Sequence, residues 1–460
     1  MTWMLLSSLA LAAPAMLDAG TLAPFDASEE EEPSRGPWWA TLDDPVLVET
    51  VDTATRSNEE LGAAWARVAA ADANLWVVGS PLLPAASFDV STTGQPLDNV
   101  AFCSVGQPDF LNPPDADWCW QGSARLNARW QLDVFGTNAL ATRAAAFEAQ
   151  ATKGDRDAQE LQVAARVAGA YLDVVAAARQ LDIVQTQLQS QRDLLTVVEL
   201  RFEQGSSTSL DVLQQRSAVS AAEALLPPAR ISVQATEQAL AVLLGADPRA
   251  DIPTAEVLPE LGPPPAPGTP EGLAARRPDL RAATLRHRAS KAQLTSATLS
   301  LAPTLQANAG AGWNYVFAPD LDTLEGWSVG GTLSVPLFNG GATHGRIRGA
   351  RANRDVAVHS WNQALLQATS EVHQALLQDR ENATRRTAVD QQLGAARLAY
   401  EESRERYLAG IDTFLTVLTA WNSLQQAELN SLQAHRDQLT ARINLFVALG
   451  GSPSAPGDTP

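Results

Sequence analysis

The chain contains a tandem duplication, and this feature limits its possible folds most strongly. When residues 201–248 are placed over residues 406–453 without gaps, fourteen of the 48 positions are identical. Unrelated segments would match at roughly one position in fifteen. The matches include Arg201 with Arg406, Gly205 with Gly410, Leu210 with Leu415, and Leu244-Gly245 with Leu449-Gly450. We therefore expect two copies of one structural unit.

The rest of the chain divides around these two copies. We place the first repeat at residues 38–251 and the second at residues 273–451, joined by a Pro-rich linker over residues 252–272. Proline lacks an amide donor and fixes φ, so this linker should form neither helix nor central strand. Residues 452–460 are polar and Pro-rich and are expected to form a flexible tail.

The N-terminus predicts export from the cytoplasm. Residues 1–12 are mostly apolar and are followed by Ala13-Pro14-Ala15, a small-residue site of the kind that signal peptidase cleaves. We predict a signal peptide over residues 1–15 and an acidic linker over residues 16–37. A buried N-terminal helix is the alternative, because the first residues carry no Lys or Arg.

Each repeat is expected to contain a very long helical hairpin. Residues 137–204 contain no proline, and a heptad spacing places apolar residues at Val174, Leu181, Leu188, Leu195 and Phe202. About 65 helical residues would extend for about 100 Å, far longer than a globular domain requires. A cytosolic coiled coil would show the same heptads.

Four segments alternate between apolar and polar residues with a period of two, which is typical of strands with one apolar face. They lie at about residues 85–93, 122–135, 304–317 and 326–337. A lipid-facing barrel with an aqueous lumen requires this pattern. A soluble half-buried sheet would also produce it, but we expect no second layer here to cover the apolar face.

Any membrane span should be made of these strands, because beyond the N-terminus no uninterrupted run of about 18 apolar residues occurs. Four strands cannot close a barrel, and open strand edges are not tolerated in a bilayer. Three copies, with twelve strands, form the smallest assembly that leaves a lumen.

Composition excludes several other functions. A formal net charge of −19 argues against nucleic-acid binding, which needs clustered cations. Cys103 and Cys119 lie in one Gly/Pro/Asp-rich segment, and in an exported chain they are predicted to form a loop disulfide. The region lacks the further Cys or His that a zinc site needs. The five histidines are scattered and no catalytic motif occurs, so we predict no enzyme, metal site or cofactor.

Four motifs occur in a fixed order along the duplicated frame. They are Trp130-Gln131-Leu132-Asp133-Val134-Phe135-Gly136, Arg276-Arg277-Pro278-Asp279-Leu280, Val335-Pro336-Leu337-Phe338-Asn339-Gly340-Gly341 and Asn444-Leu445-Phe446-Val447-Ala448-Leu449-Gly450-Gly451. With the repeat, they resemble the outer-membrane factor (TolC/OprM-like) efflux family from about Trp38 to Gly451. The resemblance implies a homotrimer with a twelve-stranded transmembrane β-barrel in outer-membrane lipid and an α-barrel of helical hairpins in the periplasm.

The resemblance also implies partners. They would be a periplasmic adaptor (membrane fusion) protein and an inner-membrane pump of the RND type, or an ABC transporter for type I secretion. The exported substrate is not indicated by the sequence. A periplasmic coiled-coil adaptor or scaffold is the alternative function, although an adaptor would carry one helical hairpin and this chain has two.

Several residues are candidates for roles in such a channel. Gly205 and Gly410 predict sharp helical reversals, because glycine readily adopts the left-handed conformation that ends a helix. The resemblance implies that the acids after them, Asp211 and Asp412, form a periplasmic gate. Alternatively, they favour the first turn of a helix through its macrodipole.

Charged residues are also predicted on one strand of the first repeat. Arg125, Arg129 and Asp133 share its polar face and are predicted to face the lumen, where they set the potential or only solvate the wall. In addition, Pro227-Pro228 predicts a kink or break in the helix of the first repeat alone.

Overall fold

The computed structural model of the protein describes residues 14–25, 37–96, 118–316 and 323–451. The chain forms two compact units. One unit contains residues 69–151 and 284–359, and the other contains residues 16–68, 152–283 and 360–460. Most of the predicted signal peptide and the whole predicted tail lie outside the described residues, so these assignments stay predictions.

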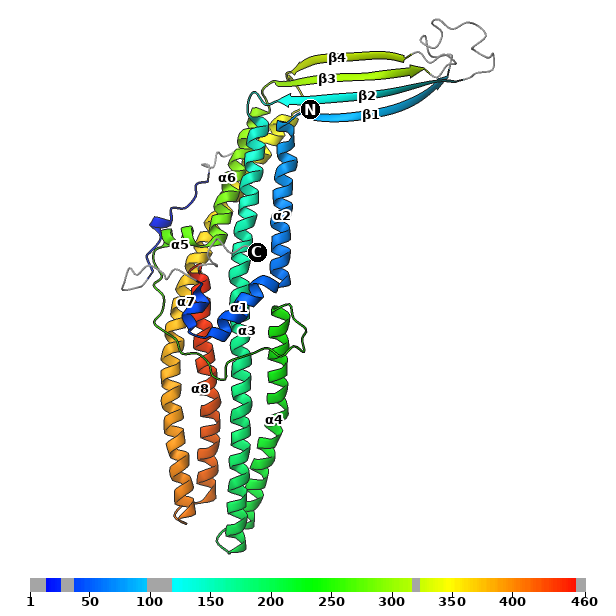
Figure 1. The fold of residues 1–460 in the computed structure, drawn as a ribbon. Helices are drawn as coiled ribbons and strands as arrows, with labels where there is room; N and C mark the ends of the chain where they lie inside the picture. The colour runs from blue at the N-terminus through cyan, green and yellow to red at the C-terminus, as the bar shows by residue number, and fades with distance from the viewer. Residues whose placement is uncertain (1–13, 26–36, 97–117, 317–322, 452–460) are drawn as a thin grey trace, which may run out of the picture. The chain divides into compact units, whose positions relative to one another are not determined.

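The order of elements follows the duplication (Figure 1). Short elements come first: η1 (Ala19–Thr21), η2 (Trp38–Leu42), α1 (Pro45–Ser57), α2 (Glu59–Gly79) and η3 (Ser80–Leu82). The first repeat continues with β1 (Ala85–Pro96), β2 (Trp118–Leu132), α3 (Thr137–Glu203) and α4 (Ser209–Leu243). The second contains α5 (Pro270–Arg276), α6 (Pro278–Leu299), β3 (Thr304–Val316), β4 (Thr323–Ser334), α7 (Ala342–Leu408) and α8 (Phe414–Ala448).

The long helices preserve the repeat residue for residue. Helices α3 and α7 each contain 67 residues, and α4 and α8 each contain 35. Their first and last residues differ by the 205 positions that separate the matched segments in the sequence. The prediction of a long helical hairpin in each repeat is therefore confirmed.

Helix α3 provides much of the main core of the helical unit. Tyr171 is fully buried, and its hydroxyl donates to Asp44 Oδ2 at 2.9 Å and accepts from the amide of Ala255 at 2.9 Å. Burial raises the pKa of this phenol, so it stays protonated. This side chain thereby ties α3 both to the start of α1 and to the segment between α4 and α5.

One stretch of α3 is strongly apolar. Within this helix an 18-residue window reaches a mean hydropathy of 1.3 with few charges, which satisfies the length and composition of a membrane span. However, 56% of that window is buried inside the protein. Its apolar side chains, among them Val163, Val167 and Leu172, belong to the core, which accounts for the window without a membrane.

Of the predicted kink or break at Pro227-Pro228, the break is wrong, because α4 continues as one helix through both prolines. A kink at this position stays a prediction. A proline removes one backbone hydrogen bond and crowds the preceding turn, but the neighbouring turns can still hold the helix. Here Ala222 and Ala229, on either side of the pair, are both buried. We infer that packing against the other helices outweighs the local cost.

The last helix of each repeat ends in the same way. Gly245 and Gly450 adopt positive φ values of 67° and 79° after α4 and α8. In the first repeat Asn58 Nδ2 donates to the carbonyl of Leu243 at 2.7 Å, and in the second Arg277 Nη1 donates to that of Ala448 at 3.2 Å. Each hairpin is thus fastened to the junction of the short helices that open its own repeat.

Candidate functional site: the sheet faces and the helical tips

The four strands form one antiparallel sheet in the order β1-β2-β3-β4. Their register brings the apolar residues of all four strands onto one face. One row across the sheet consists of Phe88, Leu126, Ala311 and Trp327, and the next consists of Ala86, Ala128, Ala309 and Val329. Several of these side chains are largely exposed, with Trp327 at 81% and Val329 at 77%.

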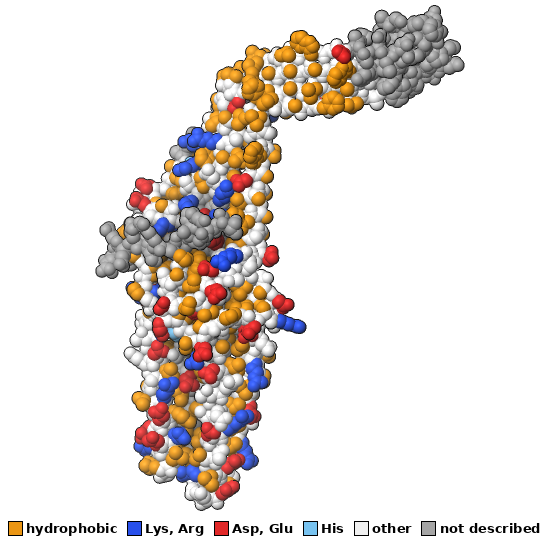
Figure 2. Space-filling model, in the orientation of Figure 1, with side chains coloured by type: hydrophobic (Ala, Val, Ile, Leu, Met, Phe, Trp, Pro, Cys, Tyr) orange, Lys and Arg blue, Asp and Glu red, His pale blue; other side chains and the backbone are white. Residues whose placement is uncertain are grey.

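Figure 2 shows hydrophobic side chains gathered over the sheet, whereas Lys, Arg, Asp and Glu are mixed along the long helices. Large apolar side chains exposed on one continuous face mark a surface that another apolar phase covers. No second layer covers this face within the described part of the chain. The sheet therefore has the character of a lipid-facing wall.

The opposite face of the sheet is polar and carries Arg125 and Arg129, as predicted from their spacing. The register places Arg125 between Asp89 and Gly312, and Arg129 between Ala85 and Asn308. Both arginine side chains are exposed. Arg125 Nη2 donates to Asn314 Oδ1 at 3.0 Å.

Asp133 does not extend this face, so its predicted position on the strand is wrong. Strand β2 ends at Leu132, and the carboxylate of Asp133 accepts from the amides of Asn138 at 3.0 Å and Ala139 at 2.7 Å. These amides belong to the first turn of α3, whose donors have no partner within the helix. Asp133 therefore caps α3 and satisfies two of its free amides instead of continuing the strand.

The two helical tips use the reversal that their glycines predict. Gly205 and Gly410 both have φ of 74°. After α3 the amide of Ser206 donates to the carbonyl of Arg201 at 2.7 Å, and after α7 the amide of Ile411 donates to that of Arg406 at 2.9 Å. These are the closing bonds of a Schellman motif. The repeat thus preserves the turn geometry as well as the residues.

The candidate gate carboxylates both lie at the tips and are held by local hydrogen bonds. Asp211 Oδ2 accepts from the amide of Thr208 at 2.9 Å and from Ser207 Oγ at 2.9 Å. Asp412 accepts from the amide of Thr413 at 3.1 Å and from Arg406 Nε at 3.2 Å. Each carboxylate stands at the start of the second helix of its hairpin.

These contacts affect the charge of the two carboxylates. Partial burial opposes ionisation of Asp211, but its hydrogen bonds to Thr208 and Ser207 hold its pKa below the ordinary range. The amide of Thr413 and the guanidinium of Arg406 lower the pKa of Asp412. Both groups are therefore anions at neutral pH.

Contacts between the two tips were not predicted from the sequence. Arg201 Nη1 donates to the carbonyl of Leu408 at 2.9 Å, and its guanidinium lies 4.7 Å from the ring centre of Tyr407. The Tyr407 hydroxyl lies 3.5 Å from Ser207 Oγ. The equivalent of Arg201 in the second repeat, Arg406, pairs with its own tip acid instead. Arg201 and Arg406 are identical at matched positions of the two repeats, and this match in the sequence could have indicated their importance.

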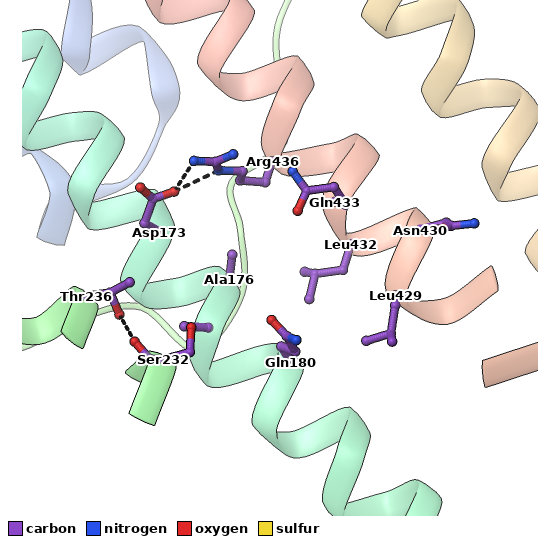
Figure 3. Close-up of a pocket in the computed structure, with 11 residues that line it drawn as sticks. Asp173, Ala176, Gln180, Ser232, Thr236, Leu429, Asn430, Leu432, Gln433 and Arg436 are labelled. Carbon is purple, nitrogen blue, oxygen red and sulfur yellow. Dashed lines mark hydrogen bonds and ion pairs between the residues drawn. The ribbon is translucent and has the colours of Figure 1, made fainter. Parts of the chain in front are cut away.

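A shallow cavity of about 350 Å³ lies between α3, α4 and α8 (Figure 3). Arg436 closes one side of it through an ion pair with Asp173, at 2.6 Å from Nη2 to Oδ1. Polar side chains dominate the rest of the lining, including Gln180, Ser232 and Gln433. No pairing of a nucleophile with a base occurs among them, so the cavity does not define a catalytic centre.

Other predicted features remain outside these surfaces. Cys103 lies outside the described residues and the side chain of Cys119 is likewise not described, so the disulfide stays a prediction. Among the described residues, no group of three or more His, Cys, Asp or Glu side chains is placed to hold a metal ion.

A polar sheet face backed by an exposed apolar face, in a chain with duplicated long hairpins, is the arrangement that a membrane channel with a wall of strands requires. The sequence profile of the outer membrane efflux protein family matches residues 50–246 and 269–451, which overlap most of the two predicted repeats. The chain therefore belongs to this family.

Relatives and solved structures agree with this assignment. The pyoverdine export outer membrane protein OpmQ of Pseudomonas putida is 31% identical over 449 residues, covering 96% of this chain and 93% of that protein. The toluene efflux pump outer membrane protein TtgF of the same species is 30% identical over 447 residues, covering 95% and 89%. The outer-membrane channel OprN has a TM-score of 0.79 at 26% identity, covering 96% of this chain and 97% of that one.

These findings confirm the predicted family, fold class and outer-membrane localisation. The chain is an outer-membrane channel component of a tripartite efflux system, and the alternative of a periplasmic adaptor is not supported. Proteins of this family are channels and not enzymes.

Proposed function

We propose that the chain works as one third of a passive conduit. The observation that carries this proposal is the open sheet, whose outer strands β1 and β4 each lack a partner on one side among the described residues. Unpaired strand edges are not tolerated inside a bilayer, because their backbone groups find no water there. Three copies joined edge to edge would pair every strand and enclose the polar face in a twelve-stranded barrel.

The conduit would be loaded by other proteins, because the described residues of this chain contain neither a metal cluster nor a catalytic constellation to drive transport. A periplasmic adaptor and an inner-membrane pump of the RND or ABC type would supply the energy and select the cargo. Two relatives named for chemically different cargoes, pyoverdine and toluene, support a channel that accepts what its pump delivers. The first 15 residues would direct export.

The assembly can be tested on the purified protein. We expect detergent extracts of outer membranes to yield a trimer that migrates as a larger species until it is heated, and we expect that trimer to conduct ions across planar bilayers. Recovery of the exported chain as a soluble monomer without conductance would contradict the proposal.

Asp211 and Asp412 are proposed to line the periplasmic aperture of this conduit. Their lowered pKa values keep both carboxylates charged in neutral solution, so a ring of them from three copies would favour cations. We expect replacement of both by Ala to raise single-channel conductance and reduce cation selectivity. Planar-bilayer recordings of the purified trimer measure both quantities.

The pair Asp211→Asn and Asp412→Asn is the matched control, because Asn removes the charge and keeps an oxygen that accepts the capping bonds. Loss of cation selectivity in the Asn pair would show the effect of the charge. A further rise in conductance in the Ala pair would show the effect of losing the capping bonds. The wild-type selectivity should persist at the ordinary Asp pKa of about 4 and fade only at lower pH, because both carboxylates have lowered pKa values. Unchanged conductance and selectivity in both pairs would remove these residues from the gate.

A further inference from the structure

The polar face of the sheet is positively charged, although the whole chain carries a formal charge of −19. Among the strand residues on this face whose side chains are described, the charged ones are Asp89, Arg125 and Arg129, and the others are neutral amides, hydroxyls, alanines and glycines. Within the described strand residues of this face, two cations therefore stand against one anion.

The one acid on this face is occupied by neutral donors. Asp89 Oδ2 accepts from Ser87 Oγ at 2.9 Å and from Asn127 Nδ2 at 2.8 Å. Arg125 donates to the neutral amide oxygen of Asn314. In the described part of the chain neither Arg125 nor Arg129 forms an ion pair. Arg129 attracts Asp89 at longer range, and both guanidinium groups retain donors for another anion.

Glycines shape the wall beside the arginines. A Cβ atom at Gly312 would lie 2.8 Å from Arg125 Cγ and 2.4 Å from the carbonyl oxygen of Ala124. The side chain of Arg125 therefore lies against β3 at Gly312, where the Cβ of any other residue would displace it. A glycine at this position allows the close approach of the neighbouring strand, because it has no side chain to collide with it.

Arg129 borders an open hollow of about 380 Å³ on the same face. Its other polar lining residues are Asn127, Gln306, Asn308 and Ser328, and no carboxylate belongs to the lining. Amide and hydroxyl groups can turn their donors toward a bound anion, and the planar guanidinium of arginine binds carboxylates in a bidentate manner. The hollow thus has the donor set for a carboxylate.

We propose that the strand section of the channel favours anions, with Arg125 and Arg129 as its selectivity residues and the hollow beside Arg129 as a subsite for small organic carboxylates. This inference rests on the proposed function, because three copies are needed to enclose the polar face. From the described strand residues, with two arginines and one aspartate in each copy, the assembly would then present six arginines and three aspartates to the lumen. Low-dielectric walls strengthen the field of such charges.

The test measures ion selectivity of the trimer in planar bilayers from the reversal potential in a KCl gradient. Arg125→Gln with Arg129→Gln should lower the chloride-to-potassium permeability ratio by about twofold or more. Asp89→Asn should change the ratio in the opposite direction. All measurements are repeated with Asp211→Asn and Asp412→Asn in place, because an acidic aperture in series would otherwise mask part of the effect.

Glu325→Gln is the matched control. Glu325 belongs to the same sheet but shares the apolar face, where it accepts from Trp313 Nε1 at 3.0 Å. Its replacement should leave the ratio unchanged. An unchanged ratio for the double arginine variant in both backgrounds, or an equal change with Glu325→Gln, would overturn the inference.

The subsite has its own measurement in the same recordings. Citrate added to the wild-type channel should reduce the current, and the double arginine variant should need about tenfold more citrate for the same reduction. Equal block of both proteins would exclude the subsite. If neither the wild-type protein nor any variant conducts, the proposed function as a conduit is contradicted, and not only the proposed selectivity of the strands.

Discussion

Replacing Asp379 by Ala is expected to destabilise the helical unit by about 3–5 kcal/mol, because it leaves a buried guanidinium without its counter-ion. The side chains of Arg442 and Asp379 are only 6% and 8% exposed. Arg442 Nε donates to Asp379 Oδ1 at 2.8 Å, while Arg442 Nη1 donates to the carbonyls of Gly262 at 2.8 Å and Pro263 at 3.0 Å. The pair thus fastens the Pro-rich linker to α7 and α8.

The measurement compares the temperature at which the helical circular-dichroism signal is lost, at one heating rate, because unfolding of a membrane protein is commonly irreversible. The double variant Asp379→Leu with Arg442→Met is the control, since apolar residues of similar volume can replace a buried ion pair at little cost. It should recover part of the lost stability, because the buried charge is gone but the carbonyls of Gly262 and Pro263 still lose their donor. A single variant as stable as the wild type would show that the ion pair does not hold the linker.

Replacing Gly245 by Ala is expected to cost about 2–4 kcal/mol. The positive φ of 67° alone costs an L-residue about 1–2 kcal/mol. In addition, the new Cβ would lie 2.5 Å from the carbonyl oxygen of Ser57, so the end of α1 must move. That movement would weaken the bonds that Ser57 Oγ and Asn58 Nδ2 donate to the last carbonyls of α4, each worth about 1 kcal/mol.

Gly205→Ala is the matched control for this effect. Gly205 also has a positive φ, of 74°, but a Cβ built there meets nothing within 4 Å. Replacement of Gly205 should cost only the free energy of the strained backbone conformation. Gly245→Ala should therefore lose its helical signal at a clearly lower temperature than Gly205→Ala. Equal losses in the two variants would mean that the contact with Ser57 contributes nothing.

The sequence predicted the parts of this protein that depend on local pattern. The alternation in residues 304–317 placed β3 within one residue of its observed end, because each side chain of a strand points to the face opposite its neighbour's. Gly205 and Gly410 marked both tips, because the left-handed turn is difficult for other residues.

The candidate site was predicted less completely. Arg125 and Arg129 lie on the polar face as expected, but Asp133 caps α3, because the sequence pattern did not reveal where the strand ends. The acids Asp211 and Asp412 lie at the tips as expected. The sequence pattern allowed either a gate or a helix cap for them, and the structure adds their hydrogen bonds to the amides of Thr208 and Thr413. The contact of Arg201 with Tyr407 joins residues 206 positions apart, and no local rule indicates it.

By itself the sequence determined the duplication, the two long hairpins, the four strands and the face on which each strand residue lies. These are periodic or repeated features, and their physical causes act between residues close together in the chain. The tertiary structure alone decided which helix faces meet. It paired Arg442 with Asp379, bonded Tyr171 to the linker at Ala255 and brought Arg125 against Gly312. Such contacts depend on packing between segments far apart in sequence, where many pairings suit the same pattern and only the whole fold selects one.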